Sequence, residues 1–189
     1  PDQAVKLVAH KEWWGQNKGN VTELTYLPIK TPSTRVAALL SGDVDIVTDL
    51  PPADFFKIKD EGKLKLIEGP EVRTIFFVMD QGSDELRDAS VKGKNPLKDV
   101  KVRKALYQAI DMDTLQRVTM RGLSQNTGAL VAPQVTGWTK DVDTRFPYSQ
   151  DASRKLLTEA GYPQGFEVDF ACPNNRYIND EEICQAITA

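Results

Sequence analysis

The side chains that could do chemistry are few and widely spaced. Nucleophilic catalysis needs a base beside its nucleophile, and the sequence has one histidine, His10, in a predicted strand. Zinc sites need clustered Cys and His, which Cys172 and Cys184 with one distant histidine do not supply. Gly161 and Gly165 are not followed by the Lys-Ser or Lys-Thr of a phosphate-binding loop. We therefore predict no catalytic residue, no metal site and no cofactor.

Two pairs of residues leave alternatives open. Asp43 and Asp45 lie two residues apart, on one face of a predicted strand, so they could act as an acid and base or be solvated carboxylates beside a turn. Cys172 ends a predicted strand and Cys184 lies in the helix after it. If that helix packs back on the strand, the two sulfurs can form a disulfide, and otherwise they are two buried free thiols.

Composition limits the class of protein. The chain has 189 residues, of which 40% are hydrophobic and 27% charged, as in ordinary globular proteins. The formal net charge of -3 argues against nucleic acid as a partner, because phosphate binding favours a basic surface. The sequence opens with Pro1-Asp2-Gln3, without an initiator Met or the charged and apolar regions of a signal peptide, and it stops inside a predicted helix. We expect a fragment of a longer protein.

The pattern of apolar residues alternates between strand and helix periods. A helix after Pro32 takes Ser33 or Thr34 as its N-cap, and Gly42 is placed to end it, while Asp99 is the candidate N-cap of a later helix. This alternation predicts an α/β fold with side-by-side strands. The predicted strands are 4–9, 24–29, 43–47, 64–67, 73–79 and 166–171, and the predicted helices after the first are 53–62, 99–110, 113–122, 151–160 and one from Asn179, with Glu182 completing a capping box.

Four segments, in this order and spacing, resemble one known family. The sequence is similar to the oligopeptide, dipeptide and nickel-binding family of solute receptors of ABC importers (family 5 of the extracytoplasmic solute-binding proteins). The resemblance covers nearly the whole chain and identifies the family rather than the ligand. The segments are Lys11–Gly15, Thr34–Ile46, Asn95–Leu106 continued by 109–111, and Pro147-Tyr148 followed by Leu156–Pro163 and Gly165-Phe166.

The resemblance implies the architecture. Relatives have an α/β, two-lobe periplasmic-binding-protein-like fold of class II, cluster C, with the solute held between the lobes. Residues 1–80 would then form the later part of lobe I and 96–189 the opening part of lobe II. Residues 81–95, rich in Gly, Ser, Lys and Asp, would form the crossing or hinge segment.

The resemblance also implies the function. The protein would bind a small solute such as a peptide and deliver it to an inner-membrane ABC permease. It would be periplasmic, with its signal peptide absent from this fragment, monomeric at full length, and without nucleic-acid partners. The candidate ligand-binding residues at the cleft edge are Thr48, Asp49, Leu50, Met79 and Asp80.

Two other functions stay open from the sequence. A ligand-sensing regulator can use the same fold, and a DNA-binding region elsewhere in its gene would identify it. A hydrolase acting through carboxylates would need a convergent acidic pocket. A solute receptor, by contrast, binds its ligand tightly without turning it over.

Overall fold

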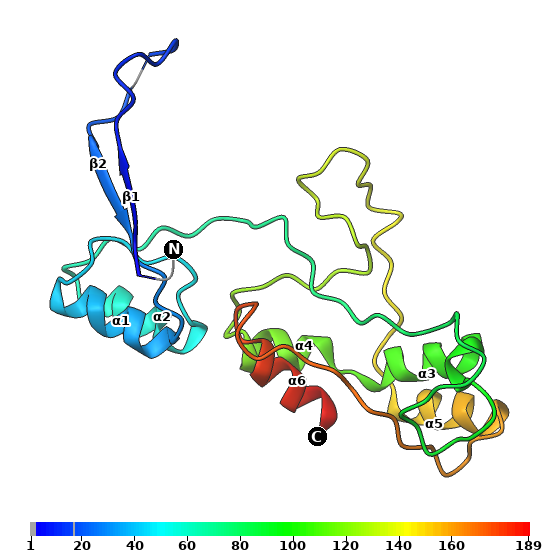
Figure 1. Cartoon of the computed structure of the whole chain (residues 1–189). Helices are drawn as coiled ribbons and strands as arrows, with labels where there is room; N and C mark the ends of the chain where they lie inside the picture. The colour runs from blue at the N-terminus through cyan, green and yellow to red at the C-terminus, as the bar shows by residue number, and fades with distance from the viewer. Residues whose placement is uncertain (1–2, 17) are drawn as a thin grey trace. The chain divides into compact units, whose positions relative to one another are not determined.

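The structure, a computed structural model, describes residues 3–16 and 18–189. The chain divides into two compact units, Pro1–Pro51 and Pro52–Ala189, and each is described by itself (Figure 1). The division into lobes at residues 80–96 is a different subdivision, made from the sequence, and it stays a prediction.

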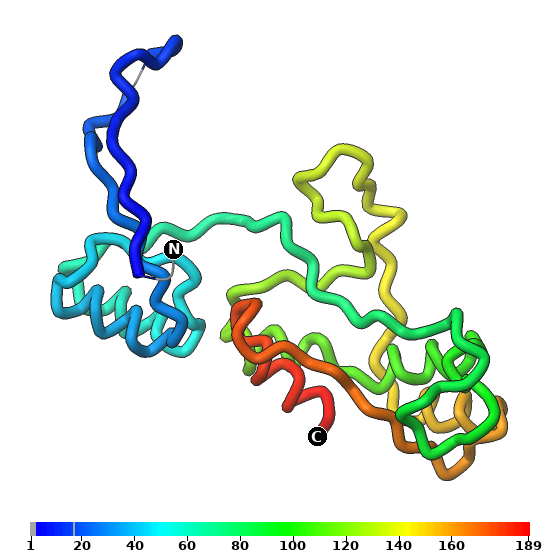
Figure 2. Tube along the Cα trace, viewed as in Figure 1, coloured from blue at the N-terminus to red at the C-terminus, as the bar shows by residue number. Residues whose placement is uncertain are grey.

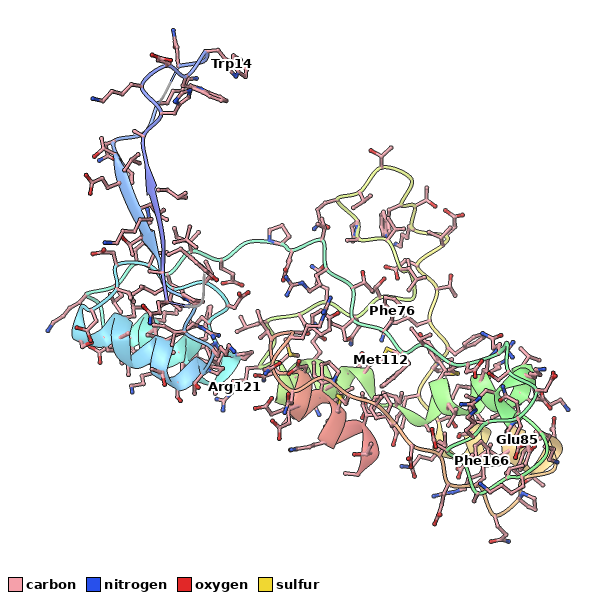
Figure 3. The ribbon with its side chains drawn as sticks, in the orientation of Figure 1. Trp14, Phe76, Glu85, Met112, Arg121 and Phe166 are labelled. Carbon is pink, nitrogen blue, oxygen red and sulfur yellow. A yellow bond between two sulfur atoms is a disulfide. The ribbon has the colours of Figure 1, made fainter. Side chains whose placement is uncertain are left out.

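A β-hairpin begins the first unit. Strands β1 (Val5–Val8) and β2 (Glu23–Tyr26) pair antiparallel, with Val5 opposite Tyr26 and Val8 opposite Glu23. The predicted strands 4–9 and 24–29 are therefore confirmed, each with shorter bounds. Trp14 lies near the tip of the hairpin with 88% of its surface exposed (Figure 3).

Helix α1 (Pro32–Ser41) follows the hairpin and begins earlier than predicted. Its N-cap is Thr31 rather than Ser33 or Thr34, because Pro32 has no N–H to satisfy and its fixed φ suits the first helical position. Gly42 ends the helix as predicted, at φ 83°, a left-handed conformation that glycine adopts without steric cost.

Helices build most of the second unit, and two of them form its core. Val102 and Ala105 of α3 are fully buried, at 0% exposure. Helix α5 packs against α3, and Ser153 Oγ donates a hydrogen bond of 2.8 Å to the Ala105 carbonyl across their interface. The elements are α2 (Pro52–Asp60), η1 (Pro96–Lys98), α3 (Val100–Ala109), α4 (Met112–Thr114), the π-helical turn η2 (Leu115–Thr119), α5 (Gln150–Glu159) and α6 (Asp180–Thr188).

Helix starts in this unit follow from side-chain caps. Asp99 caps α3 as predicted, since its carboxylate accepts from Lys101 N at 2.7 Å. The helix predicted from Asp113 instead begins after Asp111, whose carboxylate accepts from both the N–H and the hydroxyl of Thr114. A long irregular segment between η2 and α5 is visible as the green-to-yellow part of the trace (Figure 2).

Four predicted strands do not form. Residues 43–47, 64–67 and 73–79 have no strand assignment, and 166–171 contributes a single bridge, from Val168 to Ala89. The segment 73–79 is extended but exposed, with Phe76 at 58% and Val78 at 84% (Figure 3). Alternation of apolar residues predicts side-chain directions, whereas a strand also needs a neighbouring strand for its backbone hydrogen bonds. Within the described residues, no helix is both long and apolar enough to cross a membrane.

Candidate functional site

The first predicted group, Thr48 to Leu50, lies in a loop after α1. Thr48 and Asp49 are exposed and Leu50 is half-buried. Asp49 adopts φ 55°, a left-handed conformation that aspartate tolerates better than most residues. Arg35 of α1 supports the loop, because one guanidinium nitrogen donates to the Asp49 carbonyl at 3.2 Å while another donates to the Ile29 carbonyl at 3.0 Å. The Asp49 carboxylate is thereby held at the surface of the first unit.

The second predicted group, Met79 and Asp80, lies where the extended segment enters a turn. The Asp80 carboxylate accepts from the N–H groups of Gly82 at 2.9 Å and Ser83 at 3.1 Å. Hydrogen bonds from the side chain and backbone of Ser83, and from Gly82, hold the pKa of Asp80 below its ordinary value. Asp80 is therefore an ionised turn-forming residue with part of its acceptor capacity already used.

Asn95 fixes this turn to the start of η1. Its side-chain amide donates to the carbonyls of Asp80 at 2.9 Å and Ser83 at 3.0 Å, and its side-chain oxygen accepts from Leu97 N at 2.9 Å. Asn95 is 7% exposed. One buried amide thus joins the end of the extended segment to the element that leads into α3.

A cavity of about 350 Å³ lies between the extended segment and α3. The rings of Tyr107 and Phe146 meet edge to face at 5.6 Å, and Lys104 Nζ lies 4.5 Å from the centre of the Phe146 ring. The Tyr107 hydroxyl is buried and has no hydrogen-bond partner among the described residues, and burial raises the pKa of Tyr107. An apolar group with a polar end fits such a lining. The lining residues are Phe77, Met79, Gln81, Val100, Arg103, Lys104, Tyr107 and Phe146.

A disulfide joins Cys172 to Cys184 of α6, with their Cα atoms 6.5 Å apart. The structure thus has the first of the two alternatives that the sequence left open. The loop that it closes contains a turn ordered by Asp180, which is 6% exposed. The Asp180 carboxylate accepts from the backbone N–H groups of Arg176 at 2.8 Å and Tyr177 at 3.0 Å.

Asn179 gives this turn a second anchor. It adopts φ 55°, and its side-chain amide donates to the Thr119 carbonyl of η2 at 2.9 Å. The predicted capping box between Asn179 and Glu182 is wrong, because Asn179 makes no side-chain cap hydrogen bond to α6. A left-handed non-glycine residue persists where its surroundings fix it, which is common at ligand clamps.

Two charged groups, one from this turn and one from the extended segment, lie against the ring of Tyr177. Arg176 Nε donates to the Tyr177 hydroxyl at 2.9 Å, and the Arg176 guanidinium lies 5.4 Å from the ring centre. The guanidinium of Arg73, which is also paired with Glu71 at 2.9 Å, lies 5.8 Å from the same ring. Guanidinium groups bind carboxylates through paired hydrogen bonds, so this Arg-Tyr cluster (Arg73, Arg176, Tyr177) can receive an anion.

Sequence reasoning missed the Arg-Tyr cluster. Arg73 was assigned only to the start of a strand, and Arg176 and Tyr177 lie in a polar segment without periodicity. The feature of the sequence that could have identified Arg176 and Tyr177 is their position between Cys172 and Cys184, since a crosslinked loop restricts where its side chains lie. The predicted residues themselves fall in different units, with Thr48, Asp49 and Leu50 in the first and Met79 and Asp80 in the second. Their roles in ligand binding stay predictions.

The side chains that could act in acid–base catalysis, His10 and Asp43, are not part of these candidate sites. Across 3–16 and 18–189, no three His, Cys, Asp or Glu side chains gather as metal ligands would. His10 is exposed and lies two residues after β1 ends at Val8. Asp43 is also exposed, and its carboxylate accepts from Ser41 Oγ at 2.7 Å, which is the contact of a residue just after a helix end.

Curated relatives match most of this chain with a small part of their own length. Heme-binding protein A of Haemophilus influenzae is 28% identical over 169 residues, which are 89% of this chain and 28% of that protein. The dipeptide-binding protein of Escherichia coli is 27% identical over 179 residues, which are 94% of this chain and 31% of that protein. The chain therefore spans about 30% of the length of these relatives.

Solved structures show the same fold. The periplasmic binding protein AgaA of A. tumefaciens R10, in complex with agropinic acid, superposes with a TM-score of 0.69 at 24% identity, over 98% of this chain and 35% of AgaA. Lactococcal OppA, in complex with an endogenous peptide, gives 0.68 at 22% identity, over 98% of this chain and 36% of OppA. The predicted fold class is confirmed: the chain forms part of a two-lobe, periplasmic-binding-protein-like α/β fold.

The family itself is identified by a match over the full sequence. The model for "Bacterial extracellular solute-binding proteins, family 5 Middle" matches residues 1–189. The resemblance noted in the sequence is thus confirmed, and the alternatives of a sensing regulator and a hydrolase are not favoured. The chain belongs to the bacterial extracellular solute-binding proteins of family 5.

Proposed function

We propose that this chain is part of the solute receptor of a bacterial ABC importer. The whole protein binds a peptide or similar small solute between two lobes and delivers it, unaltered, to an inner-membrane permease. The observation that carries the proposal is the family match over residues 1–189. The relatives' names support a small solute, since they are heme-, dipeptide- and glutathione-binding proteins.

Binding in such a receptor is coupled to closure. A ligand that contacts both lobes stabilises the closed state by the difference between its affinities for the closed and open states. Asn95 joins the turn at Asp80 to the start of η1, so we propose that it fixes the predicted crossing segment 81–95 to the second lobe. Thr48, Asp49 and Leu50 are proposed at the cleft edge on the first lobe, and Met79 and Asp80 at the crossing.

The Arg-Tyr cluster is our candidate for the ligand's anionic group. Arg176 and Tyr177, on a turn with three separate anchors, form a preorganised receptor for a carboxylate together with the Arg73 guanidinium from the extended segment. The anchors are the disulfide, the Asp180 carboxylate and the Asn179–Thr119 hydrogen bond. A free peptide carries a terminal carboxylate, which makes peptides the first class to test.

The proposed location and partners follow from the family. Family members are periplasmic solute-binding proteins. We place this protein in the periplasm as a monomer that docks on its permease, without a nucleic-acid partner. The disulfide agrees with an oxidising compartment, where such bonds form and persist.

The test is a ligand screen on the intact parent protein. Dipeptides, tripeptides and glutathione are mixed with purified protein, and binding is measured by thermal shift and isothermal calorimetry. We expect one-to-one binding of at least one of these solutes, and the same solute recovered unchanged after prolonged incubation. Conversion of the solute to a product, detected by mass spectrometry, contradicts a transport receptor, as does the absence of binding to any of these solutes.

The Arg-Tyr cluster is tested in the same screen. Arg176→Ala should weaken the strongest binder by about 10- to 100-fold, since a hydrogen bond to a charged group contributes on the order of 1.5–3 kcal/mol. The C-terminal amide of that peptide should lose affinity for wild-type protein by a similar factor. Arg154→Ala, an exposed arginine on α5, is the matched control and should leave affinity unchanged. Equal affinity of wild type and Arg176→Ala removes the cluster from the site.

A further inference from the structure

We propose that the Cys172–Cys184 disulfide holds the Arg-Tyr cluster in position and that its redox state controls ligand binding. In the oxidised protein it keeps Arg176 and Tyr177 positioned for the ligand, and its reduction loosens them and weakens binding. The inference rests on the proposed function, because it assigns regulation to the same candidate site.

The crosslink spans the turn that carries the cluster. The bonded cysteines are 12 residues apart, and both Arg176 and Tyr177 lie between them. Cys184 belongs to α6, which contacts η2, so the bond ties a loop to a packed helix. Cutting it frees the loop at Cys172 and leaves the helix in place.

The remaining anchors make loosening, rather than unfolding, the expected response. After reduction the Asp180 carboxylate can still accept from Arg176 N and Tyr177 N. Asn179 can still donate to the Thr119 carbonyl. The chain from Cys172 to Asn175, however, loses its covalent tie, and no strand ladder holds it. The Arg176 side chain then samples more orientations, which raises the entropy cost of binding.

The disulfide is accessible to a reagent. Cys172 and Cys184 are half-buried, and both line an open groove of about 260 Å³. The rest of the groove is formed by Phe170, Pro173, Asn174, Glu181, Gln185 and Thr188, and its exposed lining surface is more apolar than polar. A thiolate from a protein dithiol can approach one sulfur along this groove.

The chemistry is ordinary thiol–disulfide exchange. The attacking thiolate of a dithiol reductant forms a mixed disulfide with one cysteine sulfur, the Cys172–Cys184 bond breaks, and the other sulfur leaves as a thiolate. The second thiol of the reductant then displaces the first cysteine. Two electrons and two protons pass from the dithiol to the cysteines, and the dithiol becomes a disulfide. A disulfide-bearing oxidant reverses the sequence.

The experiment compares oxidised, reduced and Cys172→Ser/Cys184→Ser forms of the intact protein. Reduction uses dithiothreitol followed by alkylation of the two thiols. Hydrogen–deuterium exchange of ligand-free protein reports on residues 172–181, and calorimetry reports affinity for the strongest-binding peptide of the screen. We expect exchange in this segment to rise about 10- to 100-fold and affinity to fall about 10-fold, with α3 and α5 unchanged.

The two readouts separate failure of this inference from failure of the proposed function. If hydrogen–deuterium exchange at residues 172–181 is unchanged in both the reduced and the double-serine forms, the disulfide does not hold this segment in position, whatever the ligand results. Faster exchange with unchanged peptide affinity overturns the link to binding. Absence of peptide binding in every form removes the proposed function, and with it this inference, even if exchange responds. The double-serine form controls for alkylation, because it lacks the bond without carrying an added group.

Discussion

Removal of the Asn95 side chain should detach the crossing segment from the start of η1 and α3, and should lower the free energy of unfolding. Asn95→Ala deletes three hydrogen bonds, two donated to the carbonyls of Asp80 and Ser83 and one accepted from Leu97 N. The carbonyls belong to exposed residues and can bind water instead, so each bond contributes about 0.5–1 kcal/mol. Leu97 is buried at 7% exposure, and its N–H is left without an acceptor at a cost of about 1–2 kcal/mol. The expected loss of stability is about 2–4 kcal/mol.

Asn95→Asp changes only the donor end of the side chain. The carboxylate can still accept from Leu97 N, but its second oxygen faces the carbonyl oxygens of Asp80 and Ser83 at a buried position, so we expect a loss at least as large as that of the alanine variant. Asn175→Ala, at an exposed asparagine, is the matched control and should change stability by less than about 0.5 kcal/mol.

The assay is urea denaturation of the intact protein, with hydrogen exchange to locate the effect. Exchange should increase at residues 81–84 and at Leu97, and much less in α5. If Asn95→Ala is as stable as Asn175→Ala, or if Asn95→Asp is clearly more stable than Asn95→Ala, then the attribution to these hydrogen bonds is wrong.

Three further predictions concern the second unit. Val102→Ala, at a side chain with 0% exposure in α3, should lower the free energy of unfolding by about 2–3 kcal/mol, measured by urea denaturation. Burial raises the pKa of Asp180, but hydrogen bonds from the backbone N–H groups of Tyr177, Arg176 and Glu181 outweigh this effect, and the pKa is lowered from its ordinary value. The stability that the ionised Asp180 contributes is therefore complete above about pH 4 and is lost as pH falls. Asp180→Asn should flatten this acid dependence in exchange measurements at residues 176–181. Lys101→Ala should cost less than about 1 kcal/mol, and the loss should vanish in 1 M salt, because its 3.1 Å ion pair with Glu159 is solvent-exposed.

Helices were the predictable part of this fold, because their signals are local. Asp99 and Gly42 mark helix ends by what their own side chain or φ angle can do, and both assignments are confirmed. Where two candidates compete locally, sequence reasoning errs by a residue or two, as with Asp111 and Asp113. The irregular segment before Ser149 was likewise predictable from its prolines and glycines.

Strands and site residues were much less predictable, because both depend on distant partners. The alternation at 73–79 is real, but no adjacent strand within the described residues completes a ladder there. Arg73 and Tyr177 are in contact although more than a hundred residues separate them in sequence, and no local sequence pattern predicts this contact. Asp80 is predicted at the cleft edge as a ligand-binding residue, whereas its carboxylate accepts hydrogen bonds from its own turn.

The extended apolar segment at 73–79 has a consequence for handling the isolated chain. It exposes Phe76 and Val78, and no main-chain hydrogen bond from the rest of the described chain engages it, so it can pair with any strand that comes alongside. A short, β-prone stretch of this kind recruits a second copy of itself at high concentration, edge to edge. Preparations of residues 1–189 alone should therefore aggregate with a steep dependence on concentration, and a charged residue in place of Val78 should restore solubility.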